Sequence, residues 1–214
     1  MLSWLPENAS ASGQEIDALF YVIYYITGAV FLLVSGTLLV FLVRYRHRPG
    51  RPARYSHGNT TLEMVWTVIP ALILVILTIV SIPAWNRIKM QTPATDLVIR
   101  VTGKQFNWEI LYPGPDGAFG TADDLELSNE MHVPTGKPVI LRIRSKDVIH
   151  SFFVPNLRFK QDAVPGREIT AWFEASRPGK YETPCAELCG FGHSGMKGWH
   201  TPEEYANWVK EQWP

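Results

Sequence analysis

Cysteine and net charge are the two things that this sequence has little of. Only two cysteines occur in 214 residues, and 20 basic side chains are balanced by 20 acidic ones. A balanced chain offers no bulk charge to nucleic acid, so we expect no nucleic-acid partner. The motif C-x-x-C-H is also absent from the sequence, which excludes a c-type haem attached to this chain.

The first part of the chain lacks basic residues. No Lys or Arg precedes Arg44, and no cysteine near the start could carry a lipid. A cleaved signal peptide needs a basic segment before a short apolar core, so we expect the apolar run from Leu19 to Val43 to remain as a membrane span. A second apolar run, from about Leu62 to Ile82, is also long enough to cross a bilayer.

The segment between these two runs is basic and contains no acidic residue. Its arginines are Arg44, Arg46, Arg48, Arg51 and Arg54. A short basic loop between two spans stays in the cytoplasm, so both termini should lie outside. We therefore expect residues 1–90 to form an N-terminal tail and a two-helix anchor in a bacterial inner membrane, and residues 91–214 to form a periplasmic domain.

After a predicted linker from Pro83 to Pro93, the composition changes to short β-rich runs separated by turn formers. These runs are residues 97–102, 125–133, 139–144, 149–154, 168–173 and 180–183. Such punctuation predicts a β-sandwich. Residues 112–124 are rich in turn formers and acids but lack the EF-hand spacing, so we expect a solvated hairpin loop there rather than a calcium site. Near the C-terminus, Tyr205, Trp208 and Val209 share one face of a predicted helix that docks on this domain.

Both cysteines lie in one short stretch, PCAELCGFGHSGMKG, at residues 184–198. Cys185, Cys189, His193 and Met196 are soft ligands, which favour copper, and the thioether argues against zinc. The alternative is a structural disulfide, as is common outside the cytoplasm, but the added histidine and methionine, with His150 upstream, argue against it. A mononuclear blue-copper site uses one cysteine, so the second suggests two copper ions bridged by both sulfurs.

This stretch resembles the binuclear CuA motif of cytochrome c oxidase subunit II. The resemblance covers about residues 15 to 210, including LEMVWTVIP at 62–70 and DVIHSFFVP at 147–155. It implies a membrane-anchored all-β protein, with a two-helix transmembrane hairpin followed by a cupredoxin-like β-sandwich. It also implies that Cys185 and Cys189 bridge two coppers and that His150 and His193 each bind one. Met196 and the main-chain carbonyl of Glu187 would be the weak ligands.

The resemblance further implies the function of an electron-transfer subunit of a haem–copper terminal oxidase. Electrons from cytochrome c or another periplasmic donor would pass through CuA to haem a in subunit I. Oxygen would be reduced there, at the haems and CuB of that subunit, with protons pumped across the membrane. Subunit III is a further expected partner. The alternative is a CuA-bearing subunit of a nitric oxide reductase, which has the same fold and a different catalytic partner.

Four residues receive further roles from the same resemblance. The carboxylate of Glu187 would help to bind a magnesium ion at the interface with subunit I, and Glu63 would lie at the entrance of a proton channel. Electrons would enter near Phe106 and Trp108 in the stretch VTGKQFNWEILYP. The family usually has tryptophan where this chain has Phe106, so the identity of the donor stays open.

Overall fold

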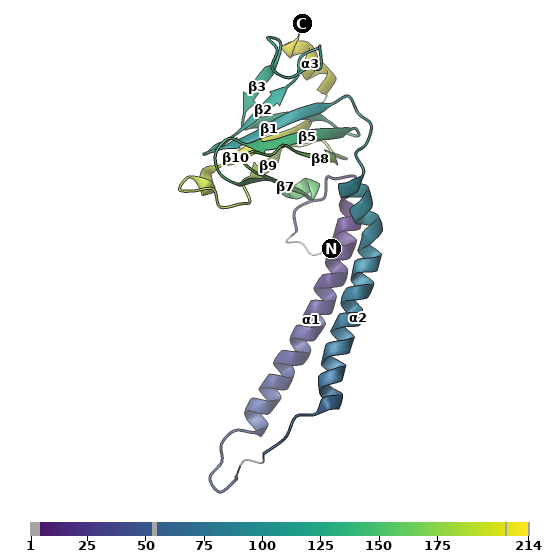
Figure 1. Cartoon of the computed structure of the whole chain (residues 1–214), viewed down its shortest axis with the longest axis vertical. Coiled ribbons are helices and arrows are strands. Elements are labelled where there is room, and N and C mark those ends of the chain that lie inside the picture. Colours follow the sequence, from purple (N-terminus) through teal and green to yellow (C-terminus); the bar gives the residue numbers. More distant parts are fainter. Residues whose placement is uncertain (1–4, 53–54, 204, 214) are drawn as a thin grey trace. The chain divides into compact units, whose positions relative to one another are not determined.

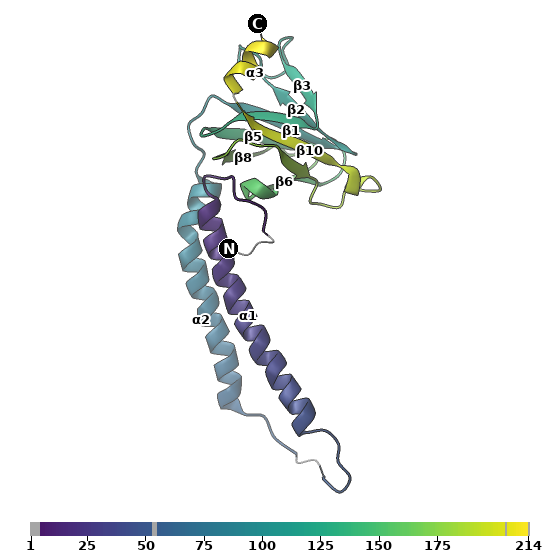
Figure 2. The same cartoon turned by 180° about the vertical axis from the view of Figure 1, so that it is seen from behind.

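The structure is a computed structural model of the chain, and it describes residues 5–52, 55–203 and 205–213. The chain divides into two compact units. One is Asp17–Trp85, and the other combines Met1–Ile16 with Asn86–Pro214. The first unit is a helical hairpin and the second is a β-domain (Figures 1 and 2).

The hairpin consists of helices α1 (Gly13–Arg44) and α2 (Thr60–Trp85). Both are long and apolar enough to cross a membrane, and their most apolar windows have no buried residue. Asn59 caps α2, because its side-chain Oδ1 accepts a hydrogen bond from the Leu62 N–H at 3.1 Å. The structure thus forms helices where the sequence predicts the two spans.

The predicted linker begins too early. Helix α2 continues past Pro83 to Trp85, and a π-helical segment follows at Asn86–Met90. A proline clashes with the carbonyl of the preceding turn and lacks an N–H, but it does not stop the residues after it from staying helical. The irregular connection to the β-domain is therefore shorter than the sequence suggested.

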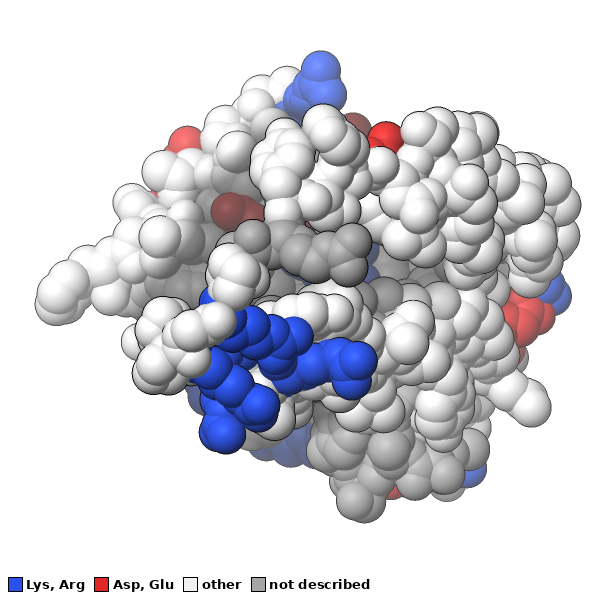
Figure 3. All heavy atoms as spheres, turned by 90° about the horizontal axis from the view of Figure 1, so that it is seen from below, with Lys and Arg blue, Asp and Glu red and all other residues white. Residues whose placement is uncertain are grey.

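The loop between the two helices carries the basic residues. Figure 3 shows Lys and Arg side chains gathered over this end of the hairpin. Arg44 at the end of α1 is exposed, as are Arg46, Arg48 and Arg51 in the loop, whereas Arg54 lies outside the described residues. This loop is thus a solvated, strongly basic surface at one end of the hairpin.

The β-domain is a sandwich built mainly from two sheets. The larger sheet has the order β3-β2-β1-β5-β8 and the smaller one the order β4-β10-β9, while β6 pairs with β7 alone. The pairs β1–β5 and β4–β10 are parallel and the other pairs are antiparallel. The strand bounds are β1 Val98–Lys104, β2 Asn107–Tyr112, β3 Leu125–Ser128, β4 Glu130–Pro134, β5 Pro138–Ser145, β6 His150–Val154, β7 Phe159–Ala163, β8 Ile169–Glu174, β9 Tyr181–Pro184 and β10 Lys197–Glu203.

The core lies between the sheets and follows from strand alternation. In β5 the side chains of Val139, Leu141 and Ile143 are fully buried, as their alternation with Ile140, Arg142 and Arg144 predicts. Trp108 and Phe152 are also buried, and their rings meet edge to face at a centroid distance of 5.1 Å. The Trp108 ring also lies 5.9 Å from that of His150, the first residue of β6.

Two terminal segments complete the β-domain. Near the N-terminus, Ala9 is fully buried, and its N–H donates to the Asn156 carbonyl at 2.8 Å. Near the C-terminus, helix α3 (Tyr205–Gln212) packs Tyr205 and Trp208 against the core, as predicted.

The residues between Tyr112 and Leu125 join the antiparallel strands β2 and β3, so the predicted hairpin loop is confirmed.

Candidate metal centre

The loop with the two cysteines joins β9 to β10 and is closed by backbone hydrogen bonds. The pairing of these strands ends at Pro184 and Lys197, and the Cys185 N–H donates to the Met196 carbonyl at 3.0 Å. The first and last candidate ligands of the loop are therefore held side by side. Between them a 3-10 turn covers His193–Gly195.

Strand β6 brings His150 to this loop. Phe152 forms an isolated antiparallel bridge with Cys185, and the Ala186 N–H donates to the Ser151 carbonyl at 3.0 Å. Since β6 begins at His150, these contacts put the imidazole beside the cysteines although 35 positions separate it from Cys185. His150 is fully buried.

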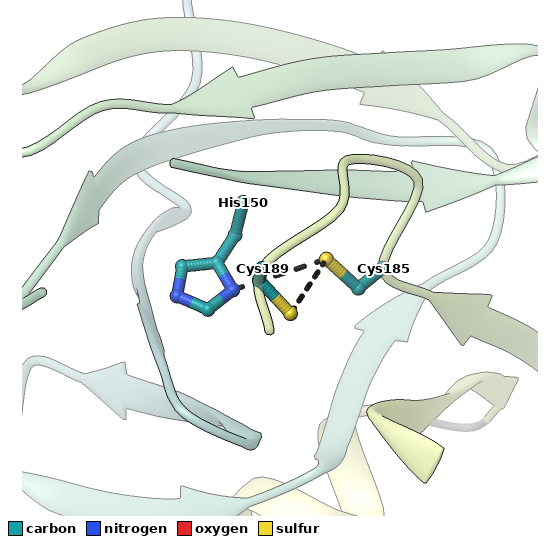
Figure 4. Close-up of side chains that lie close together, drawn as sticks. All are labelled: His150, Cys185 and Cys189. Atoms are coloured by element: carbon teal, nitrogen blue, oxygen red, sulfur yellow. Dashed lines mark hydrogen bonds between the residues drawn. The ribbon is translucent and has the colours of Figure 1, made fainter. Parts of the chain in front are cut away.

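The candidate ligand atoms lie in one small region, and Figure 4 shows three of these residues, His150, Cys185 and Cys189, close together. The sulfur of Cys185 lies 3.9 Å from that of Cys189, 3.8 Å from His150 Nδ1 and 3.2 Å from the Glu187 carbonyl oxygen. The sulfur of Cys189 lies 3.5 Å from His193 Nδ1 and 3.8 Å from Met196 Sδ. All six predicted ligand groups are thus brought together.

The two cysteines are free thiols. Their sulfurs are 3.9 Å apart, far beyond the S–S bond length of about 2.05 Å, so they do not form the alternative disulfide. Burial, together with the neighbouring Cys185, raises the pKa of the Cys189 thiol to about 11. Metal binding at this site must therefore displace protons from sulfur, which a thiophilic ion does far more readily than magnesium or calcium.

Hydrogen bonding determines which nitrogen of His150 faces the sulfurs. Its Nε2 lies 2.8 Å from Asp147 Oδ1, so the carboxylate favours the tautomer that has its proton on Nε2 and Nδ1 toward the sulfurs. Burial raises the pKa of Asp147, but hydrogen bonds from His150 and from the Gln105 and Val148 N–H groups outweigh it and leave that pKa below its ordinary value. Two thiols, two Nδ1 atoms, a thioether and a carbonyl form a soft donor set that fits copper.

The other predicted site residues lie in different environments. Phe106 is 38% exposed beside the metal loop, whereas Trp108 is fully buried, with its ring 5.9 Å from that of His150. Glu187 is exposed, and only its main-chain carbonyl contacts Cys185. Glu63 lies in the first turn of α2, in the helical unit.

Two family models together match most of the chain. Residues 2–84 match the transmembrane domain of cytochrome c oxidase subunit II, and residues 105–198 match its periplasmic domain. The chain belongs to the cytochrome c oxidase subunit II family. The two-helix hairpin is therefore a membrane anchor, the sandwich is the family's cupredoxin-like domain, and the chain is a subunit of an oxidoreductase.

Similar proteins agree along the length of the chain. Cytochrome c oxidase subunit 2 of Thermostichus vulcanus is 33% identical over 97% of this chain and 78% of its own length. The alternative cytochrome c oxidase subunit 2 of Bradyrhizobium diazoefficiens is 31% identical over 98% of this chain and 83% of its own length. The crystal structure of the periplasmic domain of subunit II of cytochrome oxidase from Bradyrhizobium japonicum is 32% identical, with a TM-score of 0.50, and covers 57% of this chain and 96% of that domain.

Sequence reasoning missed two polar residues at the site. Asp147 contacts His150, and the side-chain amide of Gln105 donates to the Cys189 carbonyl at 2.6 Å. Asp147 stands three residues before His150 within the quoted motif, which is a signal that could have been followed. Gln105 lies in the turn between β1 and β2, and nothing in its own segment points to Cys189.

Proposed function

We propose that this chain is the electron-entry subunit of a haem–copper terminal oxidase. It would accept electrons from a periplasmic donor and pass them to haem in subunit I, where oxygen is reduced and protons are pumped. One observation carries this proposal: six soft or neutral donor groups converge at 3.2 to 3.9 Å in a member of the subunit II family.

The proposed ligand roles follow from the atoms that face one another. Cys185 and Cys189 would bridge two copper ions, with His150 Nδ1 beside the first sulfur and His193 Nδ1 beside the second. The Glu187 carbonyl adjoins Cys185 and the Met196 thioether adjoins Cys189, so each ion would gain one weak ligand. When bound, this copper pair would supply one-electron transfer.

The chain itself keeps the ligands in place and away from water. His150 and Met196 are fully buried, and Cys185 and Cys189 are 7% and 3% exposed. The buried rings of Trp108 and Phe152 pack on each other, and the Trp108 ring also contacts that of His150, so the site borders on the apolar core. Ligands that move little during a change of charge keep the reorganisation energy low, and the surrounding packing supplies that rigidity.

An apolar surface beside the metal loop supports the proposed contact with the donor. Phe106 is 38% exposed, Leu188 is 78% exposed, and Phe191 is fully exposed. Phe106 would form the outer contact, and buried Trp108 would lie behind it next to His150. The charges of the β-domain are nearly balanced, so a mostly apolar contact fits this surface better than a strongly electrostatic one.

The orientation of the chain is proposed from its charges and from its N-terminal segment. The basic loop between α1 and α2 favours the cytoplasm. The residues before α1 pack on the β-domain through the Ala9 and Asn156 backbones, so both ends of the hairpin would emerge on the same, periplasmic side. In the assembled oxidase, Glu63 would then lie near a proton entrance at the cytoplasmic face. The exposed Glu187 carboxylate would be free to help bind magnesium at subunit I.

Copper stoichiometry tests this function. The full-length chain in detergent micelles, loaded with copper, should bind two ions and turn purple, and its mixed-valence form should give an electron spin resonance spectrum with one electron shared by two nuclei. Cys185→Ser should abolish the shared signal, whereas Asp116→Ala in the exposed β2–β3 loop should leave it intact. One copper per chain with a single-nucleus signal would refute the binuclear site.

A further inference from the structure

The turn between β1 and β2 lies against the metal loop and against the start of β6. Its residues Gln105 and Phe106 come from the larger sheet and are exposed. They nevertheless contact segments that are more than forty residues away in sequence. This turn supplies no candidate metal ligand, so its contacts must serve a purpose other than direct coordination.

Asp147 joins the turn to His150. One carboxylate oxygen, Oδ1, accepts hydrogen bonds from His150 Nε2 at 2.8 Å and from the Val148 N–H at 2.6 Å. The other, Oδ2, accepts one from the Gln105 N–H at 2.7 Å. A carboxylate held from both sides in this way cannot rotate freely, so it fixes both the tautomer and the ring plane of His150.

Gln105 joins the same turn to Cys189. Its side-chain Nε2 donates to the Cys189 carbonyl at 2.6 Å, directly beside one of the two proposed bridging sulfurs. The neighbouring Phe106 ring lies so close to Gly192 that a Cβ there would be 2.4 Å from Phe106 Cδ2. The turn therefore contacts the metal loop on both sides of Gly190.

We propose that Asp147 and Gln105 form a brace that positions His150 and Cys189 for metal binding. Both are positioning residues, because neither has an atom among the candidate ligands. The inference rests on the proposed function for its purpose. Residues that orient a metal ligand in this way typically change metal affinity about 10- to 100-fold when they are replaced.

The physical reason lies in what each contact prevents. Without Asp147, the His150 proton can reside on Nδ1, the nitrogen that faces the Cys185 sulfur, and block metal binding there. Without the Gln105 amide, the Cys189 carbonyl loses a partner and the loop can rotate the sulfur away from Met196. The brace thus connects one ligand from the β6 strand and one from the β9–β10 loop to a single turn.

The first test is made without metal. In the copper-free full-length chain labelled with nitrogen-15 histidine, His150 should show the Nε2–H tautomer, assigned by its loss in His150→Gln. Asp147→Ala should produce a mixture of tautomers. Asp147→Asn should restore the Nε2–H form, because its amide oxygen can still accept the hydrogen bond. A wild-type tautomer in Asp147→Ala would overturn the role of Asp147.

The second test measures copper. Asp147→Ala and Gln105→Met should each weaken copper binding about 10- to 100-fold, measured by competition with a chelator, and should alter the copper electron spin resonance spectrum. Two matched controls should behave like wild type: Asp116→Ala in the exposed loop, and Gln161→Met, whose amide contacts Lys89 instead. Equal losses in the controls and the brace variants would overturn the proposal.

Two further outcomes separate the brace from the proposed function. If Asp147→Ala does not fold, the copper affinity of Gln105→Met tests the brace instead, because Gln105 is exposed and lies outside the core. Unchanged copper affinity in Gln105→Met would overturn the brace. If wild type binds copper as proposed but neither variant differs from it, the brace is wrong and the copper site stands. If the tautomer responds as expected while wild type binds no copper pair, the binuclear site is wrong and the brace stands.

Discussion

The close packing of Phe106 on Gly192 leads to a quantitative prediction for the variant Gly192→Ala. A Cβ at Gly192 would lie 2.4 Å from Cδ2 and 2.5 Å from Cγ of Phe106. Carbon atoms in contact sit about 3.5 to 4.0 Å apart, so the ring must move outward by roughly 1 Å or more. The backbone of Gly192 itself accepts alanine, since its φ is −88°.

The size of the effect follows from how much of Phe106 is buried. The residue is 38% exposed, so moving the ring into solvent forfeits the remaining burial. Full burial of a phenylalanine side chain contributes about 1.5–3 kcal/mol, so its partial burial contributes about 1–2 kcal/mol. We expect Gly192→Ala to lower the free energy of unfolding by that amount.

A double-mutant cycle with Phe106→Ala isolates the clash. Urea unfolding of the copper-free full-length chain in micelles, followed by tryptophan fluorescence, gives the four free energies. In the Phe106→Ala background the added methyl meets no ring, so Gly192→Ala should be neutral or stabilising by about 0.4–1 kcal/mol. The coupling between the two positions should thus be about 1–3 kcal/mol.

Gly195→Ala is the matched control, because a Cβ at that glycine has no heavy atom within 4 Å. Gly195→Ala should leave the free energy of unfolding unchanged both in the wild-type chain and in the Phe106→Ala variant. If Gly192→Ala is equally destabilising with and without the Phe106 ring, the two residues are not coupled. The contact of the β1–β2 turn with the metal loop would then be energetically unimportant.

Four other changes have expected outcomes. Burial raises the pKa of Glu109, but hydrogen bonds from Lys104 and Lys146 outweigh it, so its folded pKa lies below the ordinary 4.5. The stability that the ionised carboxylate contributes is fully present above about pH 4.5 and is lost as the pH falls through the folded pKa. In urea titrations, Glu109→Gln should therefore lower the free energy of unfolding by about 1–3 kcal/mol near pH 7 and by less near about pH 3.5. Glu63→Gln should slow turnover of the assembled oxidase without changing its copper content, and unchanged turnover across pH would leave Glu63 as an interfacial carboxylate. The rate at which a basic soluble cytochrome c reduces the copper centre should depend little on ionic strength, and a rate that falls steeply with salt would instead show electrostatic docking. A reporter fused after Pro49 should be active only in the cytoplasm and one at the C-terminus only outside, and the reverse pattern would contradict the proposed orientation.

Local patterns were sufficient for much of the fold. The two spans are visible because an uninterrupted apolar run of that length is rare outside a membrane helix, and β5 is visible because one face is buried and the other is not. Strand β10 was missed because it contains Gly198 and Pro202, which normally argue against a strand. Strand β7 was missed because FKQDA is mostly polar and pairs only with β6.

One predicted strand was wrong in a way that sequence alone could not reveal. The run from Leu125 to Val133 reads as continuous, but it divides at Asn129 into β3 and β4, which belong to different sheets. Asn129 has a φ of 59°, a conformation that asparagine tolerates better than most residues. The Asn129 side-chain oxygen accepts a hydrogen bond from the backbone N–H of Trp108 at 2.8 Å, so strand β2, which lies earlier in the sequence, stabilises the break between β3 and β4.

The candidate site likewise has a part that the sequence predicts and a part that only the tertiary structure reveals. Cys185, Cys189, His193 and Met196 share one short loop, so their spacing is readable from the sequence. Gln105 meets Cys189 only because a turn of one sheet folds over a loop beside the other, and no spacing rule encodes that contact. Sequence therefore predicted the atoms that could bind metal, whereas the residues that hold those atoms in place needed the tertiary structure.

The two candidate histidines differ in how they are held. His150 is fully buried on a strand, hydrogen-bonded to Asp147, and in contact with the Trp108 ring. His193 is only partly buried and lies in a 3-10 turn near the surface. The buried histidine, held by strand β6, is better suited to keep the geometry constant while the charge of the site changes.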